Sequence, residues 1–97
     1  MSESHDISRP AILVRRPTPM ELTELGVSDW DIWEKGISTF DYHDNEKEEC
    51  YFLKGEAIIS TREREHKIGK GDLVVFPEGL DCQWQITSPV KKQYRFS

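Results

Sequence analysis

Alternation of apolar and polar residues is the main pattern in this chain, and it predicts β-strands. In the clearest case Cys82, Trp84 and Ile86 fall on one face of an extended segment and polar residues fall on the other. Turn-forming residues, among them Gly36, Gly55 and the Ser88-Pro89 pair, separate the segments. The predicted strands are Ala11–Val14 at an edge, Asp31–Glu34, Ile37–Tyr42, Glu49–Leu53, Glu56–Thr61, Lys67–Ile68, Leu73–Phe76, Asp81–Ile86 and Lys91–Phe96. Many short strands of this kind are typical of a β-sandwich or β-barrel.

One segment is apolar on both faces. Glu48, Cys50 and Phe52 share one face of the extended chain, and Tyr51 and Leu53 share the other. We therefore expect both faces to be covered, one by the barrel interior and the other by a neighbouring sheet or a second subunit. Because so small a chain has little with which to cover both, the pattern predicts a homodimer.

A short helix is predicted before the strands. Thr18 is a suitable N-cap, Pro19 suits the first helical position, and Glu21 completes a Thr-x-x-Glu capping box. Gly26 is a typical C-terminal residue, so the helix is expected over Pro19–Leu25. Residues 1–10 are polar and are predicted to form a flexible tail, which leaves residues 11–97 as one domain.

Composition narrows the possible partners. The 97 residues carry a formal net charge of −5, which does not favour nucleic acid or an anionic membrane surface. No apolar run approaches the roughly 20 residues that a membrane-spanning helix needs, and the polar first residues do not resemble a signal peptide. We therefore expect a cytoplasmic protein whose Cys50 and Cys82 are reduced thiols.

Two stretches resemble the motifs of the cupin superfamily. Glu48, six residues and then Gly55 match the end of the first motif, Gly-x5-His-x-His-x3-4-Glu-x6-Gly. Gly71, Pro77, Gly79 and Cys82 match the spacing of the second motif, Gly-x5-Pro-x-Gly-x2-His-x3-Asn. The resemblance implies an all-β fold: a single-domain cupin jelly-roll β-barrel with one short N-terminal helix.

The wider segment from Trp30 to Tyr94 is similar to the small stand-alone cupins of bacteria and plants. Strings that carry this similarity include Gly-Asp-Leu-Val-Val-Phe-Pro (71–77), Cys-Gln-Trp (82–84) and Pro-Val-Lys-Lys (89–92). That branch groups with the cupin domains of ureidoglycine aminohydrolase and of ethanolamine-utilisation proteins. It has no firmly assigned reaction, and the resemblance implies a small polar, nitrogen-bearing metabolite as the ligand.

The ligand set of a metal-binding cupin is incomplete here. The paired histidines of the first motif fall on Tyr42 and Asp44, or on Asp41 and His43, depending on the spacing chosen. Cys82 stands in place of the last histidine, and only Glu48 is retained. A metal site could use His43, Glu48 and Cys82 around zinc, iron, manganese or nickel, whereas the alternative is a barrel with no metal or other cofactor.

Two residues are candidates for catalysis and four for ligand binding. A Glu48 carboxyl that faces an apolar interior would act as a general acid or base, and Cys82 is either a nucleophile or an inert core thiol. Aromatic side chains would stack on a planar ligand or simply form the core. The candidate ligand-binding residues are Tyr42, Phe52, Phe76 and Trp84.

Three functions stay open at this point. The first is a cupin that binds a small polar metabolite inside the barrel, with Glu48, Cys82 and Trp84 facing the cavity. The second is a metal-dependent enzyme that uses His43, Glu48 and Cys82. The third is a non-catalytic accessory or structural protein whose barrel is filled by its own side chains.

Overall fold

Strands make up most of the molecule. The computed structural model describes residues 11–97, and the tail predicted over residues 1–10 lies outside them. The elements are β1 (Leu13–Arg15), α1 (Pro19–Leu25), a 3₁₀ turn η2 (Val27–Asp29), β2 (Asp31–Lys35), β3 (Ser38–His43), β4 (Glu48–Ser60), β5 (Glu65–Gly69), β6 (Leu73–Phe76) and β7 (Asp81–Phe96). The predicted all-β fold with one short N-terminal helix is confirmed.

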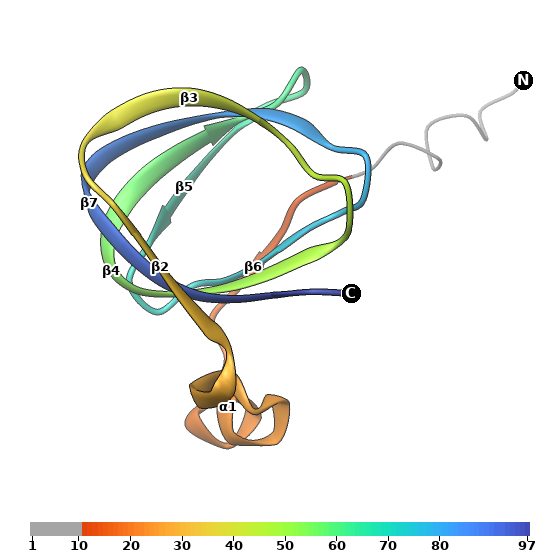
Figure 1. The fold of residues 1–97 in the computed structure, drawn as a ribbon, viewed down its shortest axis with the longest axis vertical. Helices are drawn as coiled ribbons and strands as arrows, with labels where there is room; N and C mark the ends of the chain where they lie inside the picture. Colours follow the sequence, from red (N-terminus) through yellow and green to blue (C-terminus); the bar gives the residue numbers. More distant parts are fainter. Residues whose placement is uncertain (1–10) are drawn as a thin grey trace, which may run out of the picture.

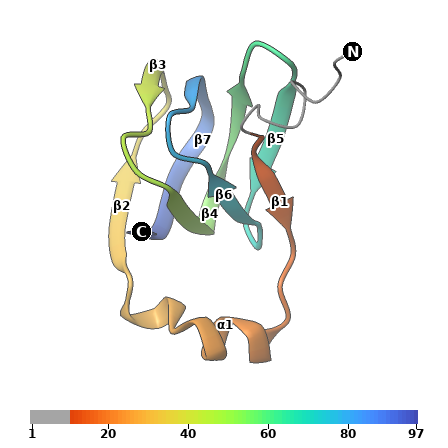
Figure 2. The same ribbon diagram turned by 90° about the vertical axis from the view of Figure 1, so that its right-hand side faces the viewer.

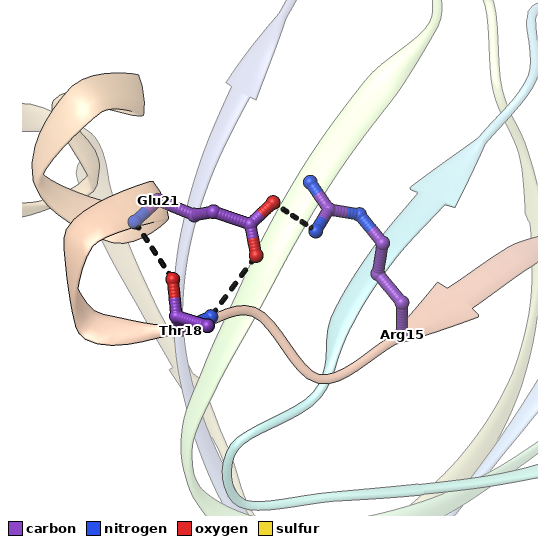
Figure 3. A network of polar contacts seen from close by, with 3 residues as sticks. All are labelled: Arg15, Thr18 and Glu21. Atoms are coloured by element: carbon purple, nitrogen blue, oxygen red, sulfur yellow. Dashed lines mark hydrogen bonds and ion pairs between the residues drawn. The ribbon is translucent and has the colours of Figure 1, made fainter.

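Helix α1 begins and ends where its local signals predict. The Thr18 hydroxyl accepts a hydrogen bond from the Glu21 backbone N–H (3.2 Å), and the Glu21 carboxylate accepts one from the Thr18 N–H (3.0 Å). Arg15 donates to the same carboxylate at 2.7 Å, as Figure 3 shows. Gly26 ends the helix with a φ of 72°, a left-handed conformation that glycine adopts without steric cost.

Two long strands replace four predicted short ones. Gly55 and the Ser88-Pro89 pair do not end strands; they lie inside β4 and β7, where the register between the two strands shifts. A Cβ atom on Gly55, whose φ is 90°, would lie 2.1 Å from the Pro89 carbonyl oxygen. Where turns were expected, β4 and β7 instead have irregularities that lie opposite each other, and both strands bend there without ending.

The long strands hold the sheet together because each pairs with different neighbours along its length. The first half of β4 pairs with β6 and its second half with β5, while the two strands β4 and β7 pair with each other throughout. The first half of β7 pairs with β3 and its second half with β2. All the pairings are antiparallel, and the resulting seven-stranded sheet curls around a central core (Figure 1).

The core lies on the concave side of this sheet. Every second residue of β7, from Cys82 through Trp84 and Ile86 to Val90 and Lys92, is buried except the half-buried Ser88. Residues 48, 50 and 52 of β4 are buried on the same side. The predicted inward positions of Glu48, Cys82 and Trp84 follow from this alternation.

Part of the outer face of β4 is covered by the chain itself. Val27, Trp30 and Leu73 form a second buried cluster, against which Leu22 and Tyr51 pack. Figure 2 shows α1 crossing one end of the strands, between β1 and β2. Tyr51 is thus covered without a second subunit, whereas Leu53, the other outward apolar residue of this segment, is not part of the cluster. The homodimer stays a prediction.

Within residues 11–97 no helix has both the length and the apolar character that crossing a membrane requires.

Candidate functional site

A small pocket opens on the concave side of the sheet beside β7. Its volume is about 110 Å³. We call it the β7 pocket, since half of its lining comes from that strand. It is lined by Trp33, Phe40, Tyr42, Glu48, Trp84, Lys92, Tyr94 and Phe96.

Strand register brings these residues together. In one row across the sheet, Trp33 of β2 lies opposite Lys92 of β7, and Lys92 lies opposite Phe52 of β4. In another row Phe40 of β3 lies opposite Trp84 of β7. The Phe40 and Trp84 rings are stacked, with centroids 5.8 Å apart and an interplanar angle of 15°. The pocket wall is thus a set of cross-strand aromatic pairs.

A buried ion pair forms the polar part of the wall. The Lys92 ammonium donates a hydrogen bond to Glu48 Oε2 at 2.9 Å and another to Cys50 Sγ at 3.3 Å. The Cys50 thiol in turn donates to Glu48 Oε2 at 3.2 Å. Glu48 is 3% exposed and Lys92 is 5% exposed. Charges buried this deeply are stable only as a pair with further hydrogen bonds.

Aromatic rings surround the same ammonium. Lys92 Nζ lies 4.8 Å from the centre of the Trp33 ring, 4.7 Å from Trp84 and 5.6 Å from Tyr94. Burial alone would favour the neutral amine. The Cys50 sulfur and the Glu48 carboxylate outweigh burial and raise the pKa of Lys92 above its ordinary value, so the residue is a cation throughout the physiological range.

A second carboxyl lies beside Glu48. Asp44 is fully buried, and its backbone is held by hydrogen bonds to Leu80 and Gly79 in the turn before β7. Burial, followed by the hydrogen bond and the negative charge of Glu48, raises the pKa of Asp44 to about 7. Apart from this contact with Glu48, neither carboxyl oxygen of Asp44 has a hydrogen-bond partner among residues 11–97. Near neutral pH Asp44 therefore takes up a proton that it can share with Glu48.

The predicted ligand-binding residues separate into two groups. Tyr42 and Trp84 line the β7 pocket, as does Glu48. Phe52 and Phe76 are instead fully buried behind Trp84, with ring centroids 6.0 Å and 5.7 Å from it. These two phenylalanines support the pocket wall and do not reach its surface.

Cys82 faces the interior as predicted, but its thiol is not activated. Burial, and then the Asp44 charge, raise the pKa of Cys82 to about 12. The Cys50 pKa is also raised, chiefly by burial. Both thiols are free and buried. A nucleophilic cysteine needs a lowered pKa, so the environment of Cys82 matches a core thiol.

His43 points away from Glu48 and Cys82. It is the last residue of β3, on the face opposite to Tyr42, and it is exposed. Its Nδ1 lies 2.6 Å from Asp81 Oδ1 at the protein surface. The structure does not bring the predicted set of His43, Glu48 and Cys82 together as a metal-binding group, because alternation along β3 turns the imidazole outward when Tyr42 faces the pocket.

The side chains around Glu48 do not fit a divalent cation. Among residues 11–97 no group of three or more His, Cys, Asp or Glu side chains is arranged to hold a metal. One carboxylate oxygen of Glu48 already accepts from the Lys92 ammonium. A metal ion at that oxygen would meet a fixed positive charge, so the cation of this site belongs to the protein itself.

Lys92 was missed by the sequence analysis although a signal for it exists. The inward-facing residues of β7 all have even numbers: Cys82, Trp84, Ile86, Val90 and Lys92. Because Ser88 and Pro89 were interpreted as a turn, the alternation seen before them was not continued to the residues after them. A continuous alternation would have predicted an inward-facing lysine.

Two other hollows lack a buried ion pair. A groove of about 430 Å³ is lined by Lys35, Lys54 and Lys91 at the outer surface. A shallow hollow of about 660 Å³ contains the exposed pair His43 and Asp81. The β7 pocket alone among these three combines aromatic walls with a buried ion pair, and it is the candidate functional site.

Comparisons with known proteins agree with this fold. The family described as EutQ-like cupin domain matches residues 22–94. A DUF861 family protein from Thermotoga maritima is 42% identical in sequence, with a TM-score of 0.87; the match covers 90% of this chain and all of that one. No curated protein matches the chain.

Two more distant structures share the fold. A putative ethanolamine utilization protein Q from Salmonella typhimurium is 19% identical, with a TM-score of 0.60 over 65% of this chain and 51% of its own. The EutQ protein of Clostridium difficile is also 19% identical, with a TM-score of 0.61 over 88% of this chain and 66% of its own. Since the family match spans most of the chain, the predicted cupin jelly roll is confirmed, and the chain belongs to the EutQ-like cupin domain family.

Proposed function

We propose that this chain binds a small, planar, uncharged molecule in the β7 pocket. The observation that carries the proposal is the buried pair of Glu48 and Lys92, set in a wall that is otherwise almost entirely aromatic. Ligand sites in proteins commonly combine apolar walls with a few polar groups that orient the ligand. If the ion pair of Glu48 and Lys92 served only the packing of the core, no pocket would be needed beside it.

The size of the pocket limits the ligand. Its volume of about 110 Å³ lies well below the roughly 300 to 1,000 Å³ of sites for drug-sized molecules. In the liquid this volume holds about four water molecules. Tyr42 and Phe96 at its border are partly exposed, so a ligand can extend past them. We therefore expect a ligand with few non-hydrogen atoms, such as a single small ring.

The charges favour an uncharged ligand. Glu48 and Lys92 neutralise each other at 2.9 Å, so an anion in the pocket would face the carboxylate and a cation would face the ammonium. The stacked rings of Phe40 and Trp84 offer flat apolar surface to a planar group.

If the site also catalyses a reaction, Glu48 is the proposed acid or base. Its Oε1 atom is buried and, the Asp44 carboxyl apart, has no hydrogen-bond partner among residues 11–97, and Asp44 exchanges a proton near neutral pH. That pairing supports proton transfer to and from a bound molecule. We do not assign a catalytic role to Cys82, because its raised pKa keeps the thiol protonated.

The test is a ligand screen with a matched pair of variants. Small neutral planar metabolites are added to the protein, and both the melting temperature and the fluorescence of Trp33 and Trp84 are recorded. A ligand at 100 times its Kd stabilises by about 2.7 kcal/mol, which is visible as a shift in melting temperature. Hits should weaken in Phe40→Ala, which removes a pocket wall, and persist in Ile37→Ala, an exposed site outside the pocket.

A screen without hits would favour the accessory or structural protein instead. The aromatic wall and the ion pair would then serve the core of the fold alone. A cytoplasmic location and a homodimeric state stay predictions from the sequence, to be checked by cell fractionation and by light scattering.

A further inference from the structure

We propose that Glu48 and Lys92 together recognise an amide edge, that is, a carbonyl oxygen beside an N–H group, as in a lactam or a primary carboxamide. The proposal rests on the function proposed above and names the class of ligand for the same pocket. It follows from counting the hydrogen-bonding positions that the ion pair leaves open.

Glu48 supplies the acceptor. Its Oε2 accepts from Lys92 and from Cys50, whereas Oε1 is buried and, the Asp44 carboxyl apart, has no hydrogen-bond partner among residues 11–97. A carboxylate oxygen has two lone-pair positions. A proton shared with Asp44 occupies at most one of them, so Oε1 can still accept a hydrogen bond from a ligand. A buried acceptor left unsatisfied is costly, which favours a ligand that brings an N–H donor.

Lys92 supplies the donor. An ammonium group has three N–H donors, and those of Lys92 are used once by Glu48 Oε2 and once by Cys50 Sγ. No hydrogen-bond acceptor for the third is found among residues 11–97, and Lys92 lines the pocket with its Nζ atom beside the rings of Trp33 and Trp84. A ligand oxygen that reaches this N–H receives a charge-assisted hydrogen bond.

The donor and the acceptor lie side by side because both belong to one ion pair. A ligand satisfies both only if its own acceptor and donor are adjacent on one edge. A ketone would satisfy Lys92 alone, and an amine would satisfy Glu48 alone. A carboxylate would place its charge against Glu48. An amide edge is planar and uncharged and carries both groups, and its ring or alkyl part suits the aromatic wall.

Four five-membered ring probes of similar size test this inference on the native protein at pH 7.5. The probes are 2-pyrrolidone, with both groups of the edge; N-methyl-2-pyrrolidone, without the N–H; cyclopentanone, with the carbonyl only; and cyclopentane, with neither. Their Kd values are measured from backbone amide chemical shifts, which also show whether each probe contacts the residues of the β7 pocket. We expect 2-pyrrolidone to bind at least tenfold more tightly than the other three.

The outcomes separate the two proposals. Equal affinity for 2-pyrrolidone and cyclopentanone, with both in the pocket, would overturn the amide edge and leave small-molecule binding intact. If all four probes, each tested to its solubility limit, shift no pocket residue, both proposals fail. Tighter binding of cyclopentane than of 2-pyrrolidone would likewise overturn the inference, because it would show a purely apolar site.

A double variant tests whether the ion pair is the cause. Glu48→Leu with Lys92→Met removes both charges together with the acceptor and the donor, because neither new side chain carries an oxygen acceptor or an N–H donor. The matched control is Glu49→Leu with Lys91→Met, the same changes one position away on the outer face, where Glu49 pairs with Arg95 and Lys91 with Glu34. Once circular dichroism shows that both variants are folded, the tenfold preference should vanish in the first and persist in the second. A preference that persists in the first variant would overturn the assignment. If the first variant fails to fold, the probe series on the native protein decides the question.

Discussion

The Lys92 ammonium lies 2.9 Å from Glu48 Oε2, and both side chains are almost completely buried although 44 positions separate them in the sequence. The pair joins the two strands that hold the sheet together, β4 and β7. Both residues also line the β7 pocket, where Lys92 is the positive charge and Glu48 is the one metal-ligand position of the cupin motifs that this chain retains. The stability of the fold and the proposed ligand recognition therefore depend on the same contact.

Breaking this pair on one side should destabilise the protein strongly. Lys92→Met leaves the Glu48 carboxylate buried without its cation, and losses of about 3 to 5 kcal/mol are typical for such a change. The double variant Glu48→Gln with Lys92→Met removes both charges and should lose much less. The free energies of unfolding come from urea denaturation at pH 7.5. A double variant as unstable as Lys92→Met would show that lysine packing, and not charge pairing, is what matters.

Asp44 should make the protein less stable as the pH rises toward neutrality. Its pKa is about 7 in the folded chain against 3.8 ordinarily, so the folded state binds the proton more tightly. The stabilisation is complete below about pH 4 and is lost as the pH rises through about 7. Between pH 5 and pH 8 the loss amounts to roughly 3 kcal/mol, at about 1.4 kcal/mol per pKa unit.

Asp44→Asn tests this dependence, since it removes the titrating carboxyl. Urea denaturation at several pH values should show that the decline between pH 5 and pH 8 is largely absent from Asp44→Asn. It should persist in Asp41→Asn, whose side chain is exposed on the neighbouring strand. An unchanged decline in Asp44→Asn would assign the pH dependence to another group.

Gly55 should tolerate no side chain, whereas Gly79 should tolerate one at moderate cost. Both have positive φ values, 90° and 85°, which cost a residue with a Cβ about 1 to 2 kcal/mol. They differ in the space around them. A Cβ at Gly55 would lie 2.1 Å from the Pro89 carbonyl oxygen, and one at Gly79 would have no atom within 4 Å.

We therefore expect Gly79→Ala to lose about 1 to 2 kcal/mol and Gly55→Ala to lose on the order of 3 kcal/mol or more. Thermal and urea denaturation of the two variants, measured side by side, give the comparison. Equal losses would mean that β7 moves away from Gly55 at little cost and that the facing irregularities are not rigid.

The two thiols should react slowly in the folded protein. With a pKa of about 12, Cys82 has a thiolate fraction at pH 8 about a thousandfold below that of an ordinary cysteine. Cys50 is completely buried and its pKa is raised as well. Alkylation by iodoacetamide, followed by mass spectrometry, should be slow for the native chain and fast in urea. Rapid labelling of Cys82 in the folded chain would restore it as a candidate nucleophile.

Much of the local structure could be predicted from the sequence because its causes are local. The capping box of Thr18 and Glu21 lies within four residues, so the bounds of α1 were predicted correctly. The inward positions of Cys82, Trp84 and Glu48 follow from the period of two residues in an extended chain. The cupin motifs added the jelly-roll fold and marked Glu48 as a residue of the interior.

Tertiary structure decided what depends on pairing between distant strands. Local signals identified Gly55 and Ser88-Pro89 as turns, but the pairing of β4 with β7 keeps both strands continuous at these positions. Only this pairing places Lys92 beside Glu48, and only the fold brings Leu22 of α1 and Tyr51 of β4 to one buried cluster. The spacing of residues along a strand determines which face a side chain takes, but register across strands is set by contacts far apart in the sequence. For that reason the inward position of Glu48 was predictable, whereas its contact with Lys92 depended on the register between β4 and β7.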